Sequence, residues 1–294
     1  MFRTIASLDA VVTKLSHFID ASGLREEEKT RIKGTIESSA LPFLKLQVLP
    51  YGKSTVKPVS SLAPMLTEWA DVSKTLIIAL PTEQLFPVVD LWRLAFLSTT
   101  VGTWILEEPV GTRWIISEFL EKAGVKSLPR PFVLTLLKCL SNAFCTPGLS
   151  RRLLAPGLLR EKLTDLAISQ LLEEDNLVRT AAASLIFNIA SSTQVQRADI
   201  GKSGFVPHVP TGADVEWEIE VVSAVIEGIR REEGEEIREF SVTLKDHPVE
   251  ATQSIGWLQV LDSSFGCPQH TKLSYRNYWR CFRLGSCWRG KRPH

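Results

Sequence analysis

PFVLTLLKCLSNAF, at residues 131–144, has a similar segment on each side of it in the chain. LFPVVDLWRLAFLS (85–98) precedes it and NLVRTAAASLIFNIASS (176–192) follows it. Each of the three segments has the apolar spacing of a helix. The segment at 85–98 is apolar nearly all round, which predicts that its helix is central and buried. The chain therefore contains a helical motif that recurs along its length.

Matching polar positions give the period of this motif. Lys138 lies 45 positions after Arg93, and Asn188 lies 46 positions after Asn142. A repeat of this length is typical of armadillo and HEAT units, in which paired or tripled helices stack on one another. The sequence predicts an all-α fold, an armadillo/HEAT-like α-solenoid of helical repeats. Such solenoids usually bind extended partners, so we expect a binding module rather than an enzyme.

The remaining sequence is also mostly helical in pattern, with Pro and Gly residues between the helices. Gly102 is one of the predicted breaks. Residues 40–61 contain three prolines and are predicted as a loop, in which LPFLKLQVL is a strand or a segment packed in a groove. The predicted helices are 4–21, 24–39, 62–79, 82–99, 112–123, 130–145, 150–155, 158–173, 176–191 and 214–232.

The last of these helices has one clear apolar stripe. Its members recur at helical spacing, and they are Val215, Ile219, Val222, Ile226 and Ile229. A short helical pattern also begins at 254–261 and ends at Asp262.

The charge is divided unequally along the chain. Of 34 Lys and Arg residues, seven lie in residues 267–294, which contain no acid; the preceding residues have 27 against 33 Asp and Glu. We expect three parts: an N-terminal helical extension (1–34), a solenoid (35–261) and a basic aromatic tail (262–294) that is disordered or aberrant.

Composition narrows the class of protein. No run of 18 uncharged apolar residues is present, and the N-terminus lacks a signal-peptide pattern. Five cysteines, an odd number, are typical of free thiols in a reducing compartment. We therefore expect a cytoplasmic or nuclear protein without a membrane partner.

No catalytic or cofactor motif emerges. Two Gly-Lys-Ser tripeptides lack the glycine five residues earlier that a phosphate-binding loop requires, because Gln47 and Gln196 occupy those positions. We expect no catalytic residues, no metal and no cofactor.

The tail leaves alternatives open. Cys267, His270, Cys281 and Cys287 form C-x2-H-x10-C-x5-C, an irregular spacing for zinc. The basic and aromatic residues could also contact nucleic acid, and we expect nucleic-acid binding nowhere else in the chain.

Charged residues on the central helices are the candidate binding groups. Asp90 and Arg93 share a helix face, so they either form an internal ion pair or place Arg93 in a groove that receives an acidic or carboxylate-ended peptide. Lys138 is the matching position one repeat later, and Arg179 is a further basic candidate.

Asn142 and Asn188 are the other candidates. Asn is a poor residue inside a helix, so two of them at matching points indicate a role for the amide. That role is either to bind the backbone of an extended peptide or to form a local hydrogen bond between helices.

These segments resemble the PUL domain, an armadillo-like module. The similarity covers residues 35–260 and rests on LPFLKL (41–46), Trp69 with QLFPVVDLWRLAF (84–96), PFVLTLLKCLSNAF (131–144) and EDNLVRTAAASLIFNIA (174–190).

The resemblance implies a solenoid that binds the C-terminal tail of the hexameric segregase AAA ATPase, valosin-containing protein, in ubiquitin-dependent protein turnover. It also implies a basic groove, formed here by Arg93, Lys138, Asn142, Arg179 and Asn188. The chain departs from the family in two ways: Lys138 stands where the family has Arg, and the last repeat ends after Leu261.

Two alternatives to binding of the ATPase tail stay open. The chain is either a general helical-repeat scaffold for another peptide or protein, or the remnant of a fusion with thioredoxin-like and desumoylating-protease-like domains.

Overall fold

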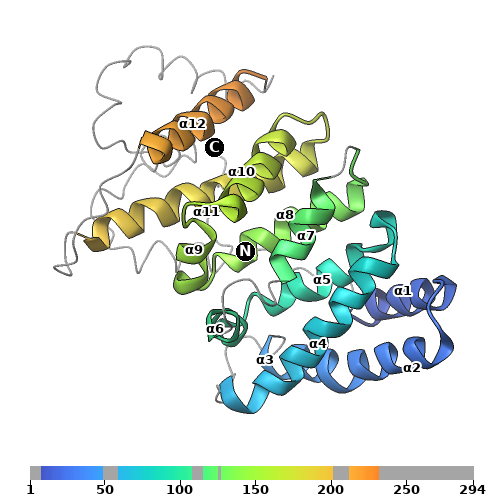
Figure 1. Ribbon diagram of the computed structural model, residues 1–294. Coiled ribbons are helices and arrows are strands. Elements are labelled where there is room, and N and C mark those ends of the chain that lie inside the picture. The colour runs from blue at the N-terminus through green and yellow to red at the C-terminus, as the bar shows by residue number, and fades with distance from the viewer. Residues whose placement is uncertain (1–7, 49–58, 108–114, 125–126, 201–211, 232–294) are drawn as a thin grey trace, which may run out of the picture. The chain divides into compact units, whose positions relative to one another are not determined.

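The structure is a computed structural model that describes residues 8–48, 59–107, 115–124, 127–200 and 212–231. All of them belong to one compact unit, Phe2–Arg231. Within these ranges the regular structure consists of helices and contains no strand, which confirms the all-α prediction (Figure 1). The α-helices are α1 (Leu8–Ala21), α2 (Glu26–Thr35), α3 (Leu41–Gln47), α4 (Val59–Ala79), α5 (Phe86–Ala95), α6 (Thr99–Glu107), α7 (Ile115–Ala123), α8 (Arg130–Ala143), α9 (Pro147–Leu153), α10 (Leu158–Leu171), α11 (Asn176–Ile200) and α12 (Gly212–Arg231).

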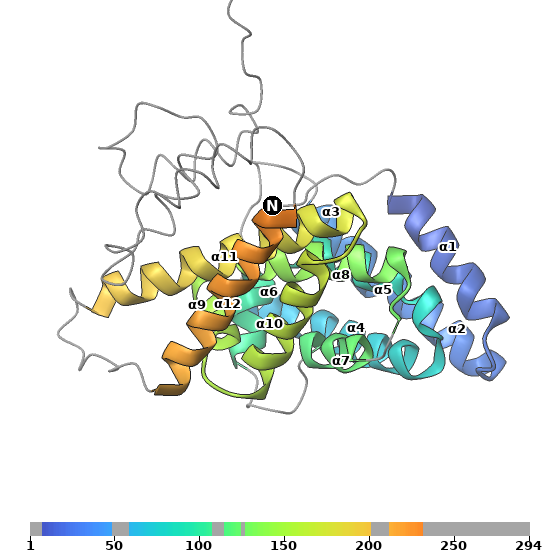
Figure 2. The same ribbon diagram turned by 90° about the horizontal axis from the view of Figure 1, so that it is seen from above.

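The helices repeat in three rows. In the first row α4 contacts α7, α7 contacts α10, and α10 contacts α12. In the second row α5 packs on α8 and α8 packs on α11, while the short helices α6 and α9 contact each other in the third row. Figures 1 and 2 show this succession from two directions. The helical-repeat solenoid predicted from the 45-residue period is therefore confirmed.

The core is centred on α5, as its apolar composition predicted. Pro87 and the continuous run from Leu91 to Ala95 are buried in this helix. Trp92 stacks on Trp69 of α4 at a ring-centroid distance of 4.3 Å and on Trp104 of α6 at 6.3 Å. The three indoles join the three rows of one repeat, so they fix how its helices pack.

The N-terminal helices pack on the repeats. α1 contacts α5, and α2 contacts α4. A π-helical turn, Ile36–Ala40, joins α2 directly to α3. The boundary predicted between residues 34 and 35 lies inside this continuous helical segment.

The prediction of a loop or strand at LPFLKLQVL is wrong for the described part, because Leu41–Gln47 is α3. Pro42 lies at the second position of α3, which directly follows the helical residues Ile36–Ala40, so its missing N–H interrupts the hydrogen-bond ladder of this continuous segment. The π-helical turn before Pro42, with hydrogen bonds between residues five apart, is wider than an α-helical turn and makes room for the proline ring. Phe43 and Leu44, which follow, are buried. Residues 49–58 of the predicted loop lie outside the described residues.

The predicted break at Gly102 is also wrong. Gly102 lies within α6, and a Cβ there would be 2.3 Å from Oγ1 of the buried Thr146, which immediately precedes α9. Glycine at this position therefore permits the close approach of α6 to α9. Gly102 is present because of this packing, and it does not mark the end of a helix.

α12, the last helix among the described residues, uses a different face from the one predicted. Val215, Ile219 and Ile226 of the predicted apolar stripe are exposed. The buried residues include Val221 and Ala224 instead. The side chain of Ile229 lies outside the described residues.

No single helix in the described ranges is long and apolar enough to cross a membrane. α8 and α9 together meet the length and composition criteria of a broken span, with a bend of 120° between them. Most residues of α8 are buried among other helices of the unit.

Candidate functional site

Asp90, Arg93 and Lys138 form a charged cluster on the second row of helices. Arg93 Nε donates to Asp90 Oδ1 at 2.6 Å within α5. Arg93 is only 4% exposed, whereas Lys138 on α8 is half-buried. Burial lowers the pKa of Lys138, and the nearby Arg93 charge lowers it further, while Asp90 opposes the change. The cluster therefore holds two cations and one carboxylate in a partly desolvated setting, where a further anion would be stabilised.

Asn142 and Asn188 form a matching pair of hydrogen bonds between helices. Asn142 Nδ2 donates to the Arg93 carbonyl at 2.8 Å, and Asn188 Nδ2 donates to the Ser141 carbonyl at 3.0 Å. Each amide thus joins its helix to the preceding helix of the second row. Of the two roles considered for the amides, the structure shows the local hydrogen bond, and Asn142 is fully buried.

The reason lies at the helix ends. Carbonyls in the last turn of a helix lack intrahelical amide partners. After α5 the Leu97 amide donates to the Leu94 carbonyl, and after α8 the Cys145 amide donates to the Asn142 carbonyl. These bonds join residues three positions apart instead of four, so the final turn of each helix is tightened. The carbonyl just before each tightened turn, that of Arg93 or of Ser141, accepts a hydrogen bond from the Asn side chain of the next helix in the row instead.

This arrangement also gives the structural register of the repeat. The two acceptor carbonyls belong to Arg93 and Ser141, which are 48 residues apart. The structural counterpart of Arg93 is therefore Ser141, and Lys138 lies about one helical turn earlier on α8. Lys138 nevertheless lies close enough to Arg93 for their charges to interact.

Replacing Asn142 with leucine is expected to lower the free energy of unfolding by about 1–3 kcal/mol, because the Arg93 carbonyl would lose a buried donor. Chemical denaturation followed by circular dichroism measures this. The matched control is Asn176→Ala at the exposed start of α11, where a change within about 0.5 kcal/mol is expected. Wild-type stability in Asn142→Leu would contradict the role of the amide.

Arg179 holds the turn before its own helix. Its Nη1 donates to the carbonyls of Glu173 and Glu174 at 3.1 and 2.7 Å. Asp175 in the same turn accepts from the amides of Leu177 and Val178, which caps α11. In this arrangement Arg179 fixes the entry into α11.

Arg130 at the start of α8 forms an ion pair with Asp175 across the second row. The hydrogen bond from Arg130 lowers the pKa of Asp175, and the amide of Val178 lowers it further. Arg130 and Asp175 are 45 positions apart, which is one period of the repeat. This spacing is the sequence signal that could have indicated the pair.

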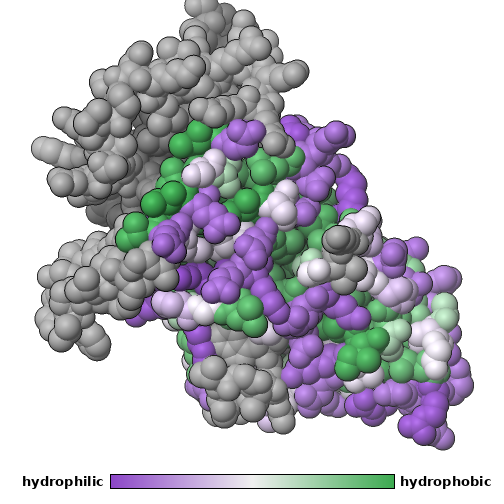
Figure 3. All heavy atoms as spheres, turned by 45° about the horizontal axis from the view of Figure 1, so that its top comes forward, coloured by the Kyte–Doolittle hydropathy of each residue, from purple (hydrophilic) through white to green (hydrophobic). Residues whose placement is uncertain are grey.

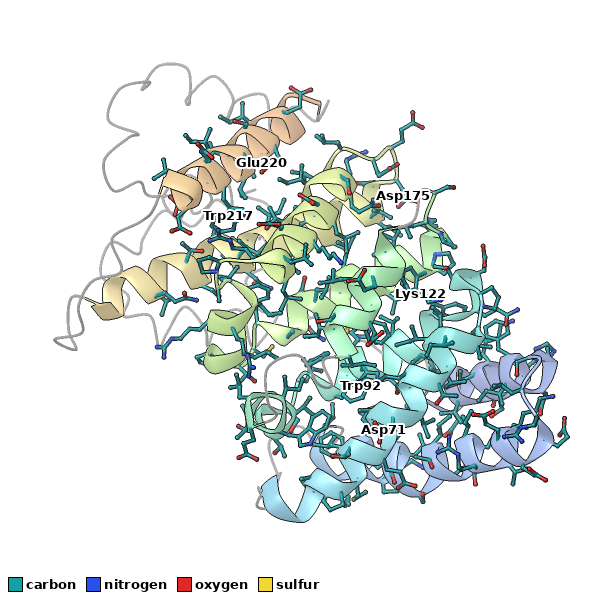
Figure 4. The ribbon with its side chains drawn as sticks, in the orientation of Figure 1. Asp71, Trp92, Lys122, Asp175, Trp217 and Glu220 are labelled. Carbon is teal, nitrogen blue, oxygen red and sulfur yellow. The ribbon has the colours of Figure 1, made fainter. Side chains whose placement is uncertain are left out.

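A half-open cavity of about 540 Å³ lies beside this pair. Helices α7, α8, α10 and α11 line it, and Lys162 and Glu121 form a second ion pair at its rim. Figure 4 labels Asp175 at this end of α11 and Lys122 on α7. None of the five predicted groove residues lines the cavity. Its lining residues are Leu120, Glu121, Ala123, Gly124, Ser127, Leu128, Arg130, Val133, Lys162, Asp165, Leu166, Ser169, Gln170, Glu173, Asp175 and Val178.

The described residues contain no group of three His, Cys, Asp or Glu side chains that could hold a metal ion. Cys139 is buried, and burial raises the pKa of its thiol, so the reactive thiolate is disfavoured. The pattern of Cys267, His270, Cys281 and Cys287 lies outside the described residues.

The three rows of helices and the cationic cluster of α5 and α8 define an armadillo-like helical-repeat module. The sequence model of the PUL domain matches residues 1–244, and the chain belongs to the PUL domain family, whose members are protein-interaction modules. The match includes residues 1–34, the N-terminal helical extension predicted from the sequence. No curated protein and no solved structure matches the chain.

Proposed function

We propose that this chain is a non-enzymatic adaptor that binds the C-terminal tail of the hexameric segregase AAA ATPase, valosin-containing protein, in ubiquitin-dependent protein turnover in the cytoplasm or nucleus. Membership of the PUL domain family supports a protein partner. The ATPase tail is the partner that the resemblance implies, and an acidic or carboxylate-ended peptide suits the charge of the cluster on α5 and α8.

The observation that carries the proposal is the setting of Lys138. Lys138 is half-buried on α8, and both burial and the nearby Arg93 charge lower the pKa of its ammonium group. A bound carboxylate would relieve this unfavourable setting, because an opposite charge stabilises the ammonium. Arg93 is buried and forms an ion pair with Asp90, whereas Lys138 is half-buried, so Lys138 is the more accessible of the two cations.

The test uses the full chain and a labelled peptide that carries the ATPase tail, with binding followed by fluorescence anisotropy. Lys138→Met is expected to lower affinity at least about tenfold, as expected for loss of a charge-assisted contact. The same substitution is expected to leave stability unchanged or raised, since it removes a partly desolvated cation. Lys122→Met on α7 is the matched control, and its affinity should equal that of the wild type.

Two outcomes would contradict the proposal. One is a well-folded wild-type chain that does not bind the peptide. The other is equal loss of affinity in Lys138→Met and Lys122→Met, which would indicate general charge attraction. Arg93 is unsuitable for this test, because it is buried and its ion pair with Asp90 also supports the fold.

The affinity is expected to depend on pH through Lys138. The ammonium carries its charge below its pKa, and that pKa is lower than the usual value of 10.5. Binding should therefore be strong at neutral pH and weaken as the pH rises through this lowered pKa. Lys138→Arg should bind with little change over the same range, because a guanidinium stays protonated there. Anisotropy titrations across alkaline pH measure both, and parallel curves would contradict the assignment.

A scaffold for another peptide or protein is the second candidate function. The cavity beside Arg130 and Asp175 favours it, since its rim combines both charges over apolar side chains. A peptide unrelated to the ATPase tail whose binding is abolished by Arg130→Ala and left intact by Lys138→Met would favour this second function.

A further inference from the structure

α12 carries two apolar stripes on opposite faces. The inner stripe is Trp217, Val221, Ala224 and Gly228, and the outer stripe is Val215, Ile219, Val222 and Ile226. Both follow the same spacing of four, three and four residues, and they are offset by two residues, about 200° around the helix. A helix with two such stripes is suited to packing between two neighbours.

The inner stripe packs on α10. Val221 and Ala224 are buried, and Gly228 allows the side chain of Leu171 to approach. Trp217 Nε1 donates to Thr164 Oγ1 at 2.9 Å, and Figure 4 shows Trp217 between α12 and α10. One of the two faces of α12 therefore already has its neighbour.

The outer stripe is exposed. Val215, Ile219 and Ile226 are 46%, 58% and 40% exposed, and Val222 is half-buried. Figure 3 shows hydrophobic surface in the upper left part of the described residues, where α12 lies. The spacing of the outer stripe is that of a coiled-coil seam, which a partner helix covers with residues at the same spacing. A continuous row of this kind differs from scattered surface apolar residues, which need no explanation.

Acidic residues flank the outer stripe. Glu216 and Glu218 occupy the positions beside the seam; Glu216 is exposed and Glu218 is half-buried. In paired helices the residues beside the seam select the partner by charge. A second copy of α12 would bring like charges together and is disfavoured, whereas Lys or Arg beside the partner's seam would be attracted.

We propose that the outer stripe of α12 is a docking surface for an amphipathic helix of a partner protein whose apolar seam is flanked by Lys and Arg. This surface is separate from the cationic cluster of α5 and α8 and prefers the opposite charge. The chain would then hold an acidic peptide at one surface and a basic helix at the other.

The experiment uses the full chain and two synthetic helical peptides. Both peptides have the same Ile and Leu seam; one has Lys at the flanking positions and the other has Glu. Isothermal titration calorimetry measures their binding to the wild type, to Ile219→Asn and to Ile78→Asn. Ile78 on α4 is a matched control because it is an isolated apolar residue that is 78% exposed.

We expect the Lys-flanked peptide to bind at least about tenfold more tightly than the Glu-flanked peptide, because like charges beside the seam oppose binding. Ile219→Asn should weaken binding by about tenfold, as expected for loss of one buried aliphatic side chain, and Ile78→Asn should have no effect. The double variant Glu216→Lys/Glu218→Lys should reverse the preference between the peptides.

Several results would overturn the proposal. The wild type could bind neither peptide, which includes the case in which another part of the chain occupies the stripe. It could also bind both equally, or bind as well after Ile219→Asn. A wild-type dimer that Ile219→Asn converts to a monomer in sedimentation velocity would assign the stripe to a second copy of the chain.

Discussion

Replacing Trp92 with alanine is expected to lower the free energy of unfolding by about 3–5 kcal/mol, the range for removing a fully buried large aromatic side chain. Trp92 is completely buried between Trp69 and Trp104. Its Nε1 donates to Ser73 Oγ at 2.9 Å, so the truncation would also leave a buried hydroxyl without this donor. Chemical denaturation followed by far-ultraviolet circular dichroism measures the loss.

Two further variants separate volume from hydrogen bonding at this position. Trp92→Phe keeps part of the ring stack and should recover a substantial part of the loss. Ser73→Ala keeps the stack but removes the acceptor of Trp92 Nε1 and the hydrogen bond that Ser73 Oγ donates to the Trp69 carbonyl, so it should cost about 1–3 kcal/mol. A loss below about 1 kcal/mol in Trp92→Ala would contradict the central place of the indole stack, because surface substitutions already reach about half that value.

The second large effect is expected at the contact between α10 and α12. Arg160 Nη1 donates to Asp214 Oδ1 at 2.7 Å, and both side chains are about nine-tenths buried. The Arg160 guanidinium also lies 4.7 Å from the centroid of the Trp217 ring. Asp214→Ala would leave a buried cation without its carboxylate, which costs about 3–5 kcal/mol in known buried pairs.

The loss should be local to α12. Hydrogen exchange followed by mass spectrometry is expected to show faster exchange at 212–231 in Asp214→Ala, with α5 and α8 protected as in the wild type. The double variant Arg160→Met/Asp214→Ala should restore protection, because an apolar side chain of similar length needs no partner charge. Unchanged exchange of α12 in Asp214→Ala would contradict the importance of the pair, and a double variant no better protected than Asp214→Ala would contradict the buried charge as the cause.

Most of the fold could be predicted from the periodicity of the sequence. The segments around Trp92, Lys138 and Asn188 share a period of about 45 residues and one apolar pattern, and both features are local, so they could be recognised without coordinates. The prediction from the sequence is wrong where a local signal has its cause in the tertiary structure. Gly102 indicated a helix end, but its place is set by Thr146, which lies 44 residues further along the chain.

Residue types alone could not distinguish binding groups from structural ones. Asn142 and Asn188 were noticed because Asn is unusual in a helix, yet their hydrogen bonds go to carbonyls nearly 50 residues earlier. Arg130 and Asp175 were missed even though their separation equals the repeat, because a charged residue at a helix start is common and carries no signal by itself.

The sequence by itself determined that this chain is a stack of helices with a repeated seam, because helix formation and amphipathic spacing depend on residues three and four positions apart. Only the tertiary structure decided which face of each helix is covered. α12 shows the reason: its inner and outer stripes have the same spacing, and the choice between them depends on Arg160, Thr164 and Leu171 of α10, whose positions relative to α12 no local pattern specifies.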